Sequence, residues 1–270
     1  MIRRAIVFTF VAHEFRDLRT NARVLPLLFI FPLMGIGFPV AIALLGPMMV
    51  TEAARDPGMM AVLRAASSLQ DFQGLEMAEA MTRYMLRAVV AFYLLMPIAI
   101  ASTAAAFSIV GEKQQRTLEP ILATPITDRE FLVGKLVVCL LPTVAVTWST
   151  ALVAIGLVDL VTVLRTGQAI LPDRFWLAGV GLLAPLLGTA VTLVTMRLSA
   201  RSVDPQATVQ TSALTIVPGF LVIFGLFGKV LIASFPALLA GIGLALVIDL
   251  WLFRVVERTF EREEILTRWR

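Results

Sequence analysis

The chain has 270 residues, of which 59% are apolar and 16% are charged, and its formal net charge is +4 at pH 7. Soluble domains carry about 45–50% apolar and about 25% charged residues, so this composition excludes an ordinary water-soluble globule. The single cysteine, Cys139, excludes an intrachain disulfide.

Six stretches of 19 or more residues contain no Asp, Glu, Lys or Arg. A bilayer core about 30 Å thick requires about 20 apolar helical residues to cross it, and each stretch supplies them. We therefore predict an all-α membrane protein, a single transmembrane domain over residues 1–270 with six transmembrane helices. The predicted spans are 24–50, 88–110, 136–158, 175–196, 206–227 and 231–253.

The N-terminal residues 4–20 predict a helix that lies along the membrane surface. Val7, Val11, Phe15 and Leu18 recur at spacings of 4, 4 and 3 residues, while arginines fill the opposite side. The apolar run is short and no small-residue cleavage site follows it, so a signal peptide is the weaker interpretation.

The flanking charges predict the orientation of the chain in the membrane. With six spans both termini share a face, and that face holds 16 Lys and Arg against 12 Asp and Glu, whereas the other face holds 7 of each. Because cytoplasmic loops carry the excess of basic residues, we expect both termini to be cytoplasmic. Anionic lipid and orientation account for the basic character, so no nucleic-acid partner is expected.

The connections on the outer face differ in length. In the first, 52–87, Glu79 and Arg83 stand at the i,i+4 spacing that supports a helix running on into the second span, where Pro97 would kink it. The second, 159–174, leads to Phe175 and Trp176, which we expect at the membrane interface. The last connection is so short that the sequence also allows a partly re-entrant segment at 226–236.

Ionisable residues inside a span usually have a function, and only Asp249 qualifies by sequence. It could belong to a gate or an ion path, or it could be an interfacial anchor paired with an arginine such as Arg254. His13 is the only histidine, so an intramembrane zinc site lacks its ligands. No GxxxxGK[ST] frame occurs either, so we expect no catalytic, metal or cofactor site in this chain.

The segment between the second and third spans, residues 111–135, is rich in local signals. Leu118, Ile121 and Leu122 fall at i, i+3 and i+4 between two prolines, which predicts a short helix over 116–124 with an apolar patch. Residues 127–130 then match a capping box, which predicts that the third helix starts at Thr127. The apolar patch could dock a partner, or it could fold back onto lipid and the ends of the spans.

Residues 108–136 resemble a stretch of the permease subunits of type-2 ABC exporters, SIVGEKQQRTLEPILATPITDREFLVGKL in this chain. Residues 13–33, 199–210 and 260–270 resemble the family's other cytoplasmic segments, and the first of these matches its elbow helix and first span. One departure is Arg116, where many relatives have glycine. The resemblance implies that the short helix is a coupling helix that docks into the ATPase subunit. The residues it assigns to coupling are Glu112, Arg116, Thr117, Leu118, Glu119, Pro120, Ile121, Leu122, Thr124 and Pro125.

The resemblance further implies a transport subunit of an exporter in the plasma (inner) membrane of a prokaryote. Its expected partners are a separate ABC ATP-binding subunit, which holds ATP and Mg, a second permease copy or paralogue, and the lipid bilayer. Two alternatives from other classes are a membrane scaffold whose loop docks a non-ATPase partner and an ion-motive carrier that uses Asp249.

Overall fold

The computed structural model describes residues 25–53, 72–115, 127–201, 204, 206–212 and 234–259, and all regular structure within them is helical. The helices are α2 (Leu25–Ala53), α4 (Met77–Gln115), α6 (Asp128–Thr166), α7 (Arg174–Ala178), the π-helix η2 (Gly179–Leu183), α8 (Ala184–Arg201) and α10 (Phe235–Thr259). Residues 206–212 add a short helical piece.

Five candidate membrane spans lie within the described residues, which confirms the all-α membrane class. They are Phe29–Gly46, Met77–Val110, Arg129–Thr166, Arg174–Ser199 and Phe235–Arg258. The other predicted elements fall largely outside the described residues: the elbow helix 4–20, the span 206–227, the re-entrant segment 226–236 and the coupling helix 116–124.

Two of the helices are much longer than a bilayer crossing requires. α4 and α6 have 39 residues each, which at 1.5 Å per residue gives about 58 Å. The hydrocarbon core is about 30 Å thick, so both helices extend well beyond it. α4 begins near the Glu79–Arg83 pair, whose side chains approach to 2.7 Å as the spacing predicts, and it continues through Pro97.

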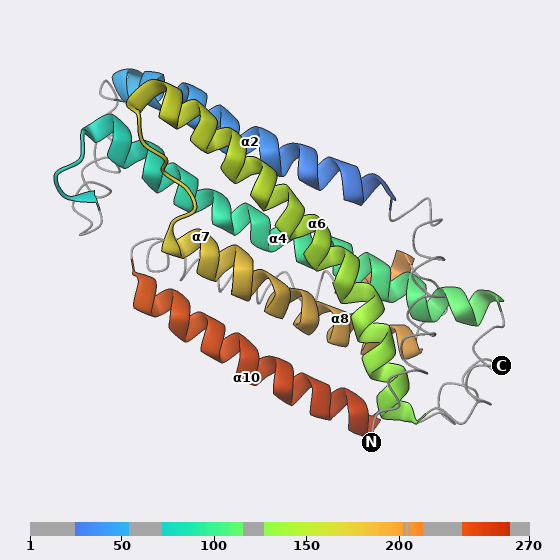
Figure 1. The fold of residues 1–270 in the computed structure, drawn as a ribbon. Coiled ribbons are helices and arrows are strands. Elements are labelled where there is room, and N and C mark those ends of the chain that lie inside the picture. The colour runs from blue at the N-terminus through green and yellow to red at the C-terminus, as the bar shows by residue number, and fades with distance from the viewer. Residues whose placement is uncertain are drawn as a thin grey trace.

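The helices form an elongated bundle in which α2 and α10 lie on opposite sides (Figure 1). α2 packs against α4 and α6, α4 packs against α8, and α10 packs mainly against α8. The C-terminal end of α4 and the N-terminal end of α6 lie at the same end of the bundle, together with the C-terminal end of α10 (Figure 1).

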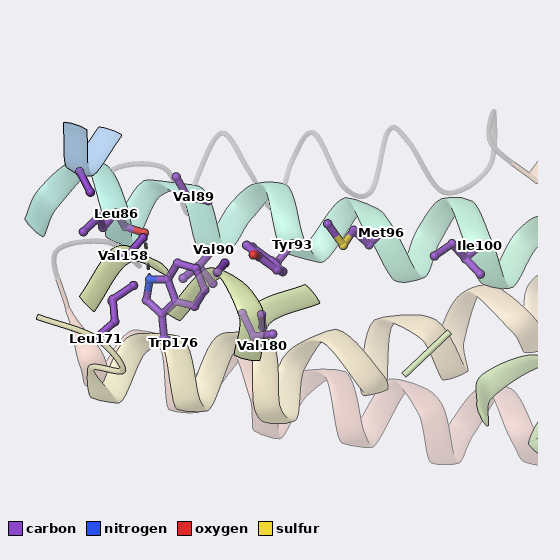
Figure 2. Packing of buried hydrophobic residues seen from close by; sticks show 13 residues of the cluster. Leu86, Val89, Val90, Tyr93, Met96, Ile100, Val158, Leu171, Trp176 and Val180 are labelled. Atoms are coloured by element: carbon purple, nitrogen blue, oxygen red, sulfur yellow. Dashed lines mark hydrogen bonds between the residues drawn. The ribbon is translucent and has the colours of Figure 1, made fainter. Parts of the chain in front are cut away.

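The largest buried cluster lies where α2, α4, α6 and the α7–η2 segment meet. Tyr93, Met96 and Ile100 follow one side of α4, and Trp176 packs against Tyr93 with ring centroids 5.0 Å apart (Figure 2). The Trp176 indole N–H donates to the Leu86 carbonyl at 2.9 Å. This bond fixes the start of the α7–η2 segment against α4.

Two prolines of α2 leave carbonyl groups without their helical hydrogen-bond donors, and side chains of other helices donate to these carbonyls. Pro39 and Pro47 have no N–H, so the carbonyls of Gly35 and Ala43, four residues earlier, lose their regular helical donors. The Tyr93 hydroxyl donates to Gly35 O at 2.8 Å. The Arg165 guanidinium donates to Ala43 O at 3.2 Å and to Leu44 O at 2.7 Å. These bonds attach α2 to α4 and α6.

The connection predicted at 159–174 is shorter than the sequence suggested, because α6 continues to Thr166 and ends with Gly167 at φ 74°. Asp159 lies within this longer helix, and its carboxylate accepts from the backbone N–H groups of Ile170 and Leu171 at 3.0 and 2.9 Å. Asp159, the charged residue at which the predicted span ended, therefore binds the backbone of the segment between α6 and α7.

Candidate functional site

The coupling residues predicted from sequence fall mainly on a segment outside the described residues. Residues 116–126 are not described, and Glu112 lies in α4 with its side chain outside the description. The structure does describe both flanks of this segment, residues 108–115 of α4 and 127–135 of α6. We call these two flanks the stem.

The start of α6 confirms the predicted capping box. Thr127 is the N-cap: its hydroxyl accepts from the Glu130 backbone N–H at 3.2 Å, and the Glu130 carboxylate accepts from the Thr127 N–H at 3.0 Å. These reciprocal bonds satisfy backbone donors that a helix start leaves open. The first turn of α6 therefore begins at a fixed residue directly after the segment 116–126.

Lys135 is buried, which the sequence did not indicate. The sequence placed it among the basic residues flanking the membrane, but its side chain is 0% exposed. Its ammonium group donates to the Ser108 carbonyl of α4 at 3.0 Å and lies 5.6 Å from the centroid of the Phe131 ring. A buried ammonium is costly unless hydrogen bonds compensate for its lost hydration. Lys135 thus joins the two flanks of the stem.

The stem also contacts α10 through a surface ion pair. Arg129 Nε lies 3.7 Å from Glu257 Oε1, and the two side chains are 61% and 36% exposed. Exposed pairs of this kind contribute only about 0–1 kcal/mol, so this contact adds little to the stability of the fold.

The structure does not bring Asp249 and Arg254 together. Asp249 is buried on the side of α10 that packs in the bundle, whereas Arg254 is exposed. Neither Asp249 carboxylate oxygen has a hydrogen-bond partner among the described residues. The gate and anchor roles considered for Asp249 both stay predictions.

The opposite end of the bundle carries a charged and aromatic cluster that the sequence analysis missed. Arg87 of α4 donates from Nε to Asp173 Oδ2 at 2.8 Å, and its guanidinium carbon lies 4.4 Å from the Phe72 ring centroid and 4.0 Å from that of Phe175. Asp173 also caps α7 by accepting from the Trp176 N–H at 2.9 Å. We call Phe72, Arg87, Asp173 and Phe175 the clamp.

Phe175 and Trp176 were expected at the membrane interface, and their depth in a membrane stays a prediction. Both side chains are buried inside the protein, at 3% and 2% exposure. Arg87 is also buried, although a charge at the edge of an apolar run can in principle reach water by extending its side chain. Asp173, Phe175 and Trp176 lie within three residues of one another, so their local spacing gave no signal for a partner 86 residues away.

The π-helix η2 lies directly after the clamp. Its residue Val180 accepts a hydrogen bond from the Trp148 indole of α6 at 3.2 Å. Gly179 lies so close to α4 that an added Cβ would overlap Val90 Cγ1. The α7–η2 segment is therefore held by both α4 and α6.

No group of three or more His, Cys, Asp or Glu residues that could hold a metal ion occurs in the part of the chain that the structure describes. Cys139 is a free, buried thiol.

The bundle of long apolar helices is that of a multi-pass membrane protein. A family model described as "ABC-2 family transporter protein" matches residues 8–248, so the chain belongs to the ABC-2 transporter permease family. No curated protein matches the chain. The family makes it a membrane transport subunit of an ABC transporter and implies association with an ABC ATP-binding subunit.

Proposed function

We propose that this chain is the permease of an ATP-driven exporter and forms the translocation path with a second permease copy or paralogue. Residues 116–124 form the coupling helix that docks into a separate ATP-binding subunit, which binds ATP and Mg. The chain itself has no catalytic role. ATP binding moves the ATPase subunits, the coupling helix follows them, and the spans switch between two arrangements.

The observation that supports this proposal is the pair of helices that flank residues 116–126. α4 and α6 extend beyond the thickness of a bilayer, and the second begins at a capping box directly after this segment. A short apolar helix placed there would stand away from the lipid, where a partner can reach it. The excess of basic residues on this face favours a cytoplasmic location, and so both termini are proposed to be cytoplasmic.

Cysteine labelling tests the orientation. In the chain with Cys139→Ala, a membrane-impermeant maleimide should label Gln168→Cys from outside the cell and Gln206→Cys only from inside, because both positions are exposed. The unsubstituted chain should resist the reagent from both sides, because Cys139 is 0% exposed. Labelling of Gln206→Cys from outside would reverse the proposed orientation.

Copurification tests the coupling helix. An unpaired charge in a desolvated contact weakens binding strongly, so Leu118→Asp and Ile121→Asp should insert and dimerise normally but release the ATPase subunit. Glu119→Ala should keep the subunit bound and lower transport per ATP, because it removes a polar contact and leaves the apolar patch. The measurements are the composition of the purified complex and its ATPase activity.

The same three variants separate the proposal from its alternatives. If Leu118 and Ile121 only fold onto lipid, all three complexes should match the parent in composition and coupling, and the coupling-helix assignment is then wrong. A parent chain that purifies with a partner other than an ATPase would favour a scaffold. Transport driven by an ion gradient without an ATPase would favour the carrier that uses Asp249.

A further inference from the structure

The Lys135–Ser108 hydrogen bond lies at the same distance from the ends of the two flanks of the stem. The acceptor, Ser108 O, lies seven residues before the end of α4 at Gln115, and Lys135 lies seven residues after the start of α6 at Asp128. Seven residues of helix correspond to about 10 Å. The bond therefore joins two helical arms of equal length that end at the segment 116–126.

The bond lies at a level where four helices meet. Ile109 of α4, Phe131 and Leu132 of α6, Met196 of α8 and Val256 of α10 belong to one buried cluster. Lys135 donates within this region, beside Phe131. A displacement of the joined arms would therefore press directly on α8 and α10 as well.

The acceptor is a backbone group, which makes the joint independent of the side chain at position 108. A charge-assisted bond from an ammonium group is stronger than a neutral one. Because Lys135 is fully buried, water cannot readily replace this bond. The bond holds one fixed point of α4 against one fixed point of α6, and it therefore opposes sliding of one arm along the other.

We infer that Lys135 is a positioning residue that makes the two arms of the stem move as one body, so that motion of the coupling helix reaches the four-helix cluster. This inference rests on the proposed function for the role of the segment 116–124. The inference names Lys135 as the residue through which motion of the docked ATPase subunit reaches the spans.

The first measurement uses the permease alone. Spin labels at Gln115→Cys and Arg129→Cys, in a Cys139→Ala chain, report the distance between the arms. The parent should give a narrow distribution and Lys135→Met a broad one, because Met fills similar space without a donor. Ser108→Ala should stay narrow because the carbonyl remains, and Lys135→Arg should restore part of the order. A narrow distribution in Lys135→Met would overturn the inference.

The second measurement uses the complex with its ATPase subunit. Spin labels at Gln168→Cys and Leu239→Cys, both exposed, report motion at the far end of the bundle. ATP should shift this distance in the parent and in Ser108→Ala, whereas Lys135→Met should keep the ATPase bound and lose the shift. An unchanged shift in Lys135→Met would overturn the transmission role, even with loosened arms.

The two measurements also separate this inference from the proposed function. A parent chain that never binds an ATPase would contradict the proposed function but leave the distance between the arms to test Lys135. If Lys135→Met does not reach the membrane, Lys135→Leu, which also lacks a donor, should show the same broadening and the same loss of the ATP-dependent shift. A Lys135→Leu chain with parental values in both would overturn the inference.

Discussion

Arg87→Ala is expected to lower the free energy of unfolding by about 3–5 kcal/mol, the usual cost of removing one partner from a buried ion pair. The substitution leaves the Asp173 carboxylate, which is 24% exposed, without its 2.8 Å partner. It also removes the guanidinium group that lies over the Phe72 and Phe175 rings. Thermal unfolding of the purified protein, followed by tryptophan fluorescence, measures this loss.

Substitutions at Asp173 separate the two roles of its carboxylate. Asp173→Asn should retain the cap of α7, because asparagine also caps helices well, and should lose only the charge. Asp173→Ala removes the cap and the charge and should therefore be less stable than Asp173→Asn. If Arg87→Ala unfolds at the parental temperature, the clamp does not hold this end of the bundle.

Gly179→Ala is expected to destabilise the protein by about 1–3 kcal/mol, the typical cost of overpacking a core. The new methyl group would overlap Val90 Cγ1, and valine has few rotamers with which to move away. Unfolding temperature and the yield of folded protein both report this effect.

The neighbouring glycine provides a matched control in the same π-helix. A Cβ at Gly181 meets nothing within 4 Å, so Gly181→Ala should be neutral or slightly stabilising. Val90→Ala should relieve the overlap, so the Gly179→Ala/Val90→Ala chain should lose less stability than the two single changes together. Equal destabilisation by Gly179→Ala and Gly181→Ala would show that the close approach is not the cause.

Local signals predicted the parts of the fold that depend on neighbouring residues. The capping box at Thr127 and Glu130 and the Glu79–Arg83 pair were readable because their partners lie three and four residues apart. The long charge-free stretches likewise predicted the helices, because a bilayer imposes one length on each crossing.

Contacts between distant helices were not readable in this way. Lys135 and Arg87 stand directly beside charge-free stretches, so the sequence alone placed them in water or at the membrane surface. Their burial depends on Ser108 O and Asp173, which tertiary packing brings within reach. Asp159 ended a predicted span because it is charged, yet α6 continues to Thr166, and the Asp159 carboxylate binds the backbone at Ile170 and Leu171.

The two prolines of α2 also bear on how related sequences can diverge. Because Pro47 has no N–H, the Ala43 carbonyl has no helical donor and accepts from Arg165. In the same way, Pro39 leaves the Gly35 carbonyl to accept from Tyr93. A relative that replaces either proline restores the N–H that competes for that carbonyl, and then gains less from keeping the distant donor. Positions 47 and 165, and positions 39 and 93, should therefore change together during evolution, although neither proline is itself a partner in the bond.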